Sequence, residues 1–273
     1  DFHWMQDICR DKAKRTFYGW MKANKEEIPE EDETRACRKI IKETFKKLKK
    51  SSVTRDEFYE LFSKSDINIS NKKFDYHIRL AEIDGMLCSG DLTSGITPTY
   101  SLVSEKIDKN NDILNINHEE ALNRITLYYF RSHSPATLED FVWWSGLNKT
   151  ECRKGIKSIE DKLTEKTIEG RTFYIYSEGR TKGVPKSSVL LLPPFDEYLI
   201  GYKSRDIVLK PEYQHHAHNK NGVFYPIISI NGRIQGNWKP RSKEGDFTFF
   251  KEKRYSKSSL SVAFKKFKEW GGV

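Results

Sequence analysis

A repeated pattern of helix and strand signals constrains the fold of this chain more than any other feature. Each copy has three segments with apolar residues at helical spacing, followed by two short segments rich in strand-forming residues. Thr54 and Phe58 of the first copy recur as a Thr and a Phe 83 residues later, and Leu61 corresponds to Trp144 at the same offset. A constant offset through capping and core positions indicates a structural repeat.

The two copies are predicted to occupy residues 33–112 and 113–180. In each, a capping box opens the second helix, because its two side chains satisfy free backbone N–H groups reciprocally. The first copy is predicted to contain a helix at 34–50, a short helix after Thr54-x-x-Glu57, a helix at 71–84 ended by Gly85, and strands at 86–88 and 99–103. The second is predicted to contain a helix from Asn117, a short helix after Thr137-x-x-Asp140, a helix after Asn148-x-x-Glu151, and strands at 164–168 and 172–176.

Three helices followed by a two-stranded ribbon are typical of the winged helix, a variant of the helix-turn-helix. The second helix braces the third, which enters the major groove of DNA, and two tandem modules would cover more than one helical turn of duplex. The chain begins without a Met, inside a helical pattern. We therefore interpret residues 1–32 as the remnant of a truncated N-terminal winged-helix module, and we expect a further segment before Asp1.

The chain changes character at residues 189–205, since the segments before them are mostly helical in pattern and those after them are mostly strand and turn. The first four of these residues predict a buried strand that Pro193 ends, because proline donates no ladder hydrogen bond. Asn231-Gly232 is the strongest hairpin signal of the chain, since both central residues of such a turn need positive φ. Residues 187–273 are thus predicted to form a C-terminal β-rich domain with a terminal helix. The predicted fold class is α+β, with tandem winged-helix modules before this domain.

The formal net charge of +9 favours an anionic partner, nucleic acid first, although a basic surface kept for solubility gives the same excess. The four cysteines are far apart and form no C-x-x-C pair, so we expect no metal, no disulfide framework and a cytoplasmic location. No membrane span, signal peptide or glycine-rich phosphate loop is visible in the sequence. We therefore expect no membrane partner, no nucleotide or other cofactor, and a monomer.

Three segments of the chain resemble one bacterial family, the winged-helix DNA glycosylases that excise alkylated bases and unhook interstrand crosslinks. They are PATLEDFVWWSGL (135–147), LLLPPFDEYLIGYKSR (190–205) and NGRIQGNWK (231–239), and they fall in the family's order with similar gaps. The resemblance covers nearly the whole chain. It implies tandem winged helices followed by a barrel-like unit, double-stranded DNA as the partner, and hydrolysis of the N-glycosidic bond of modified purines.

This sequence departs from the family's pattern at the catalytic motif. That motif is a Gln-x-Gln pair near the N-terminus that positions the attacking water, whereas Gln6, Gln214 and Gln235 are the only glutamines here and form no such pair. The resemblance places the motif upstream of the stretch that residues 1–21 match. We assign no catalytic residue, and we expect the motif in the segment before Asp1.

Basic side chains are the candidate DNA contacts. The third helix of each module presents cations that are predicted to bind phosphates, which fix the register but read no bases. The alternative is a solvated helix face. Further cations lie at the end of the segment 189–205 and along the predicted hairpin. This hairpin would approach DNA as a wing does. The predicted DNA-binding residues are Lys72, Lys73, His77, Arg79, Lys149, Arg153, Lys157, Lys203, Arg205, Arg233, Lys239 and Arg241.

Three other groups have two interpretations each. Trp143 and Trp144 are suited to stack on bases, but at helical spacing beside an apolar core at least one is expected to be buried. The adjacent acids Asp196 and Glu197 suit an acid/base site or, as we favour, a cap or salt bridge. The histidines at 215, 216 and 218 suit a metal site only with further ligands, so a surface loop is favoured.

The leading functional hypothesis is a DNA-repair glycosylase acting on alkylated or crosslinked purines. One alternative is a non-catalytic winged-helix DNA-binding protein, either a transcriptional regulator or an architectural protein. The other is a scaffold whose winged helices bind protein. A Gln-x-Gln pair in the full-length gene product would separate the first two, and salt-dependent DNA binding would separate the third.

Overall fold

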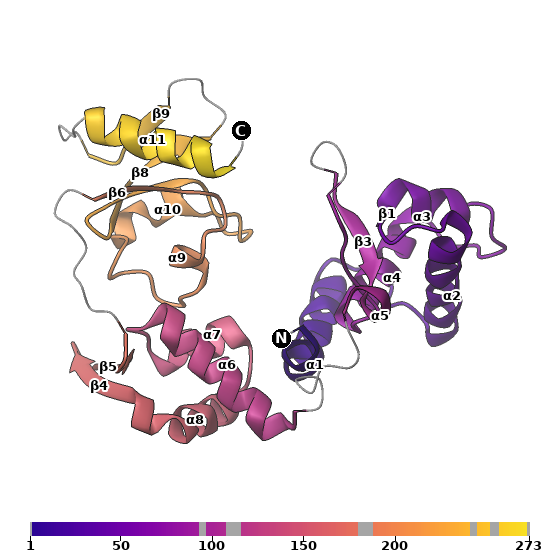
Figure 1. Cartoon of the computed structure of the whole chain (residues 1–273), viewed down its shortest axis with the longest axis horizontal. Coiled ribbons are helices and arrows are strands. Elements are labelled where there is room, and N and C mark those ends of the chain that lie inside the picture. Colours follow the sequence, from indigo (N-terminus) through magenta and orange to yellow (C-terminus); the bar gives the residue numbers. More distant parts are fainter. Residues whose placement is uncertain are drawn as a thin grey trace. The chain divides into compact units, whose positions relative to one another are not determined.

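The computed structural model describes residues 2–92, 97–107, 116–179, 188–240, 245–251 and 257–271 (Figure 1). The chain divides into two units, Asp1–Ile125 and Thr126–Val273. The predicted α+β class is confirmed, since both units combine helices with small antiparallel sheets. No helix in the described ranges is both long and apolar enough to cross a membrane.

The first unit contains four main helices. They are α1 (Phe2–Ala23), α2 (Glu31–Leu48), α3 (Arg55–Phe62) and α4 (Asn71–Ile83). The predicted capping box is confirmed at the start of α3, where the Thr54 hydroxyl accepts from the Glu57 amide and the Glu57 carboxylate accepts from the Thr54 amide. Helices α2, α3 and α4 bury their apolar stripes in one core, in which the rings of Phe62 and Phe74 stack at 4.2 Å.

A three-stranded antiparallel sheet completes this unit. Its strands are β1 (Val53–Thr54), β2 (Leu87–Ser89) and β3 (Thr99–Leu102), in the order β1-β3-β2, and the short helix α5 (Val103–Lys106) follows. The two longer strands were predicted from their residues. Strand β1 was not, because two residues are too few to form a sequence pattern.

The helical part of the second unit repeats this order. Helix α6 (His118–His133) spans the division between the units and is followed by α7 (Leu138–Ser145), α8 (Lys149–Ser158) and the 3₁₀ turn η2 (Glu160–Lys162). The predicted caps at Thr137 and Asn148 are both present, and Gly146 ends α7 with φ of 73°. Strands β4 (Leu163–Ile168) and β5 (Arg171–Tyr176) pair along their full length.

The C-terminal part is built on a four-stranded antiparallel sheet in the order β6-β7-β8-β9. One face packs against α11 (Lys257–Gly271) through Trp238, Leu260 and Phe264, and Figure 1 shows this helix lying across the sheet. The other face meets α9 (Glu197–Ile200), η3 (Pro211–Tyr213) and α10 (Gln214–Ala217). The strands are β6 (Val189–Leu192), β7 (Ile227–Ile230), β8 (Arg233–Lys239) and β9 (Asp246–Phe249).

The prediction of a barrel-like C-terminal domain is wrong. Over the described residues the sheet is open, since β6 and β9 each pair with one neighbour and not with each other. Four short strands cannot curve far enough to close around a filled interior, and α11 covers one face instead. The predicted hairpin is confirmed, with φ of 51° at Asn231 and 75° at Gly232.

A buried carboxylate joins the helical and C-terminal parts of the second unit. Asp140, 4% exposed, accepts from the Thr137 amide through Oδ2 at 2.9 Å and from the Lys203 and Ser204 amides through Oδ1 at 2.9 and 3.3 Å. Nearby, the Tyr202 hydroxyl donates to the His133 carbonyl at 2.8 Å. Residues 189–205 are therefore joined to the first turn of α7 by hydrogen bonds.

Candidate nucleic-acid interface

The lysines of α4 that were predicted to bind phosphate are held by carboxylates of the chain itself. Lys72 Nζ lies 2.5 Å from Glu26 Oε1, and Lys73 Nζ lies 2.8 Å from Glu33 Oε1. The hydrogen bond from Lys73 is the main cause that lowers the pKa of Glu33, so this carboxylate stays ionised at neutral pH. A phosphate approaching these lysines would have to compete with acids that are already in place.

His77 departs from the prediction. Its side chain is 1% exposed, and neither ring nitrogen has a hydrogen-bond partner in the described part of the chain. Burial is the main cause that lowers its pKa, and Glu33, 4.0 Å from Nε2, opposes that shift. The assignment of His77 as a phosphate contact is therefore wrong, because the ring belongs to the core. Arg79 is exposed and lies 3.3 Å from Glu82.

On α8, one predicted contact remains without an ion-pair partner among the described residues. Arg153 is exposed and unpaired, whereas Lys157 pairs with Glu160 at 2.5 Å. Lys149 pairs with Glu139 at 2.7 Å, and its hydrogen bond is the main cause that lowers the pKa of Glu139.

The charge of Lys203 also lowers the pKa of Glu139, without a hydrogen bond between the two side chains. The structure therefore gathers Lys149 and Lys203, which are distant in sequence, around the first turn of α7.

The C-terminal cations have different surroundings. Arg205 is half-buried, and its Nε donates to the Leu199 carbonyl at 2.7 Å. Arg233 is exposed and donates to the Ile207 carbonyl at 3.3 Å. Lys239 pairs with Asp246 across the β8–β9 ladder at 2.6 Å. Arg241 lies outside the described residues.

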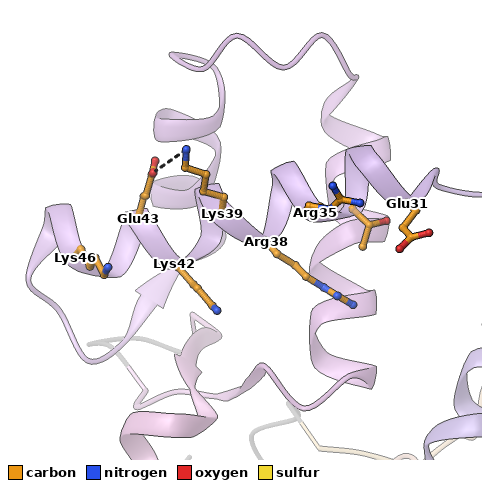
Figure 2. Close-up of a pocket in the computed structure, with 8 residues that line it drawn as sticks. Glu31, Arg35, Arg38, Lys39, Lys42, Glu43 and Lys46 are labelled. Carbon is orange, nitrogen blue, oxygen red and sulfur yellow. Dashed lines mark ion pairs between the residues drawn. The ribbon is translucent and has the colours of Figure 1, made fainter.

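A basic surface on α2 was missed by the sequence analysis. Arg35, Arg38, Lys42 and Lys46, called here the basic stripe, recur three or four residues apart and line an open hollow of about 510 Å³ (Figure 2). Within the described ranges, Lys42 and Lys46 have no ion-pair partner. Arg38 pairs with Asp84, and Lys39 Nζ lies 4.0 Å from Glu43 Oε1, an ion pair that Figure 2 marks with a dashed line.

The spacing of the basic stripe was visible in the sequence. The residues at 35, 38, 42 and 46 fall on one face of a 3.6-residue helix, and from 35 to 50 only Glu43 opposes eight cations. The prediction overlooked them because it looked for DNA contacts on the third helix of each module. Four residues of helix rise about 6 Å, so Arg38, Lys42 and Lys46 span about 12 Å. One DNA strand presents a phosphate about every 3.4 Å along the duplex axis, which is dense enough for each cation to find one.

The two adjacent acids and the two adjacent tryptophans differ in their surroundings. Asp196 caps α9 by accepting from the Tyr198 amide at 2.9 Å, and Glu197 Oε2 lies 3.2 Å from His133 Nε2, so the structural interpretation of both acids is confirmed. Trp144 packs on the Tyr129 ring at 5.0 Å, whereas Trp143 is 52% exposed. One tryptophan of the pair is therefore packed and the other faces solvent.

Comparison with known proteins gives a consistent result. A family model described as "DNA glycosylase AlkZ-like" matches residues 1–256. An interstrand DNA cross-link repair glycosylase of Streptomyces sahachiroi is 32% identical over 127 residues, which are 44% of this chain and 34% of that protein. The solved structure of the S. sahachiroi DNA glycosylase AlkZ superposes with a TM-score of 0.66 at 23% identity, covering 89% of this chain and 71% of that chain. The matched segment thus spans about a third of the curated relative, and the structural likeness shows a shared fold.

Proposed function

The chain belongs to the AlkZ-like DNA glycosylase family, and from that premise we propose that it binds duplex DNA and serves the repair of interstrand crosslinks or alkylated purines. The observation that carries the proposal is the family match over residues 1–256. A relative that is named as an interstrand DNA cross-link repair glycosylase supports the same substrate class. In the intact protein, the reaction would be hydrolysis of the bond between the modified purine and its sugar.

The proposal includes the domain organisation. Helices α2, α3 and α4 with the β1-β3-β2 sheet, and α6, α7 and α8 with the β4–β5 ribbon, each have the element order of a winged helix. We take them as two winged-helix modules over residues 33–112 and 113–180, preceded by a partial module at 1–32 and followed by the C-terminal domain at 187–273. Helix α8, with Arg153 exposed, is then the element best suited to the major groove.

In the first module, the basic stripe of α2 supplies the phosphate contacts that the paired lysines of α4 do not. Electrostatic contacts of this kind give sequence-independent affinity, which suits a repair protein that must search many sites. Among the other predicted contacts, Lys149, Lys203, Arg205 and Arg233 lie in the second unit and would act on the same ligand.

The catalytic step needs little acid catalysis. A cationic alkylated purine is already a good leaving group, so amide side chains that position water beside the sugar carbon can suffice. Gln6 is not free for that role, since its Nε2 donates to the Ile83 carbonyl at 2.6 Å and its Oε1 accepts from Arg10 at 2.8 Å. We propose that the Gln-x-Gln pair precedes Asp1 in the intact protein.

The test is base release by the full-length protein. Duplex DNA carrying 7-methylguanine, and duplex DNA joined by an alkyl interstrand crosslink, are incubated with protein and then treated with hot alkali to cleave abasic sites. We expect free 7-methylguanine from the first substrate and single strands from the second. Salt-dependent binding without release from either substrate would favour the non-catalytic DNA-binding alternative.

A further inference from the structure

Four side chains form a row on the surface of the second unit. The Arg205 guanidinium carbon lies 5.9 Å from the centre of the Trp143 ring and 5.1 Å from the centre of the Phe224 ring. The Phe224 ring in turn lies 6.1 Å from the Phe195 ring. The row, called here the aromatic row, therefore runs Trp143, Arg205, Phe224, Phe195, with a planar cation between two rings.

Hydrogen bonds to three consecutive carbonyls fix one end of the aromatic row. The last turn of α9 and its C-cap expose the carbonyls of Leu199, Ile200 and Gly201. Arg205 Nε donates to the first at 2.7 Å, Trp143 Nε1 to the second at 3.0 Å and the Tyr129 hydroxyl to the third at 3.1 Å. The indole is thus anchored by its N–H edge, although Trp143 remains 52% exposed.

The other end of the row is held by the backbone. Phe195 follows Pro193-Pro194 and has φ of 58°, a left-handed conformation that side chains with a Cβ rarely adopt. It immediately precedes Asp196, the N-cap of α9. Backbone strain of this kind persists where the surrounding structure enforces it, and it concentrates at ligand-binding sites.

Both ends of the aromatic row are open to solvent. Trp143 is 52% exposed and Phe195 is 53% exposed, so about half of the surface of each residue is accessible to solvent. A ring that is fixed and half-exposed has already lost conformational entropy and can bind a flat ligand with little further loss.

The charge around the row indicates the kind of ligand. Lys203 and Arg205 form no close ion pair in the described part of the chain, although Glu139 and Asp140 act on them by charge and Asp196 follows Phe195. The cores of protein–protein interfaces are depleted in charge, whereas surfaces that bind unpaired nucleic acid combine cations with aromatic faces. The row fits an anionic ligand that carries flat rings.

We propose that the aromatic row is a stacking surface for nucleobases whose faces become exposed in DNA bound to this protein. Trp143 and Phe195 supply the rings, Arg205 holds the row together, and Lys203 supplies charge for the adjoining phosphates. The proposal rests on the proposed function, since it assumes that the bound ligand is DNA. An exposed base face can arise from an unpaired base or from a base step that a wedge has opened.

The experiment compares the wild-type protein with Phe195→Ala, Trp143→Ala and Trp20→Ala variants. Trp20 is a matched control, because it is a tryptophan with 47% exposure in the first unit. Affinity is measured by fluorescence anisotropy, at several salt concentrations, for a fully paired duplex and for the same duplex with one extra unpaired base. A second arm measures bending of the paired duplex by energy transfer between dyes at its ends.

We expect the wild-type protein to prefer the duplex with the unpaired base, or to bend the paired duplex. Phe195→Ala and Trp143→Ala should each remove that preference or bend, with a loss of affinity of about five- to 150-fold, the range that alanine substitution of a stacking aromatic gives. The dependence of affinity on salt should stay unchanged, because no charge is removed. A Phe195→Gly variant should lose stacking in the same way while keeping or raising Tm, since glycine accepts the positive φ.

Two results would overturn the proposal. One is a pair of row variants that bind both duplexes and bend DNA as the wild type and Trp20→Ala do. The other is a wild-type protein that shows neither preference nor bending. Failure of the proposed function looks different: a wild-type protein that binds no duplex in a salt-dependent way removes DNA as the ligand, and one that stacks bases but releases none removes only the glycosylase activity.

Discussion

His77 shows how one buried side chain can make stability depend on pH. Its pKa is lowered from 6.5 by burial, so the neutral ring is the form that the folded state accommodates. Between the lowered pKa and 6.5, the unfolded chain binds the proton more strongly than the folded chain does. The free energy of unfolding should therefore fall as pH drops below about 6.5, until the ring is protonated in both states.

A His77→Leu variant tests this. It removes two buried nitrogens that have no hydrogen-bond partner in the described residues, so we expect it to be more stable than the wild type by about 1 kcal/mol at pH 7. The gain should grow as pH falls below 6.5. Urea unfolding at pH 7.5 and 5.5 measures it, with the exposed His215→Gln as control. A difference between variant and wild type that does not change with pH would contradict the prediction.

Asp140 matters for a different reason, since one buried carboxylate accepts hydrogen bonds from two parts of the fold. Asp140→Asn keeps the shape but replaces an acceptor with a donor, leaving at least one backbone N–H without a partner. We expect a loss of about 2–4 kcal/mol, because hydrogen bonds to charged groups are worth about 1.5–3 kcal/mol each. Thermal unfolding measures the loss, and Asp161→Asn on the exposed turn η2 should have almost no effect. A small loss for Asp140→Asn would mean that water replaces these bonds.

At the scale of the element, α2 is predicted to bind phosphate through its basic stripe. Replacing Lys42 and Lys46 together with Ala should lower the slope of log affinity against log salt by about one to two, since each phosphate contact contributes about 0.9. Alanine is a good helix former, so α2 should keep its stability. The matched control is Lys39→Ala with Lys64→Ala, which removes two lysines that lie beside Glu43 and Glu60. Equal slopes in both double variants would rule out the stripe as a specific contact.

Helix α8 supports a parallel prediction. Neutralising Lys149 and Arg153 together should also flatten the salt dependence of duplex binding. Arg153 should account for most of the change, because Lys149 is already paired with Glu139. Affinity of the two single variants, titrated against the same duplex, separates their shares. An unchanged slope would mean that α8 does not face the DNA backbone.

Local signals predicted the elements well. Thr54, Thr137 and Asn148 cap the helices that their capping boxes announced, and Asn231-Gly232 makes the expected hairpin. Each of these depends on residues no more than a few positions apart, so the sequence contains the whole interaction.

Interactions between distant segments were predicted poorly. No local pattern in the acidic residues at 26–33 indicates a partner, yet Glu26 and Glu33 pair with lysines of α4 that are 40 or more residues away. The barrel-like domain was wrongly predicted for the same reason. Whether the edge strands β6 and β9 pair depends on the curvature of the sheet rather than on any local pattern. His77 was misplaced because its burial depends on neighbours that the helix alone does not reveal.

At the scale of the molecule, the helical and C-terminal parts of the second unit should unfold together. The bonds from Asp140 to the Lys203 and Ser204 amides, and from Tyr202 to His133, all lie within Asn117–Val273. A fragment with these limits should fold and show one transition, with helix loss by circular dichroism and tryptophan emission changing at the same temperature. Two separate transitions would show that each part folds independently.

The three carbonyls at the end of α9 have a consequence for how the second unit responds to a ligand. Because Trp143 belongs to α7 but donates to Ile200 of the neighbouring part, any molecule that settles on the indole also reinforces the tether between them. Occupancy would then raise the melting temperature of the sheet as well as that of the helices, although the ligand touches only the surface between them.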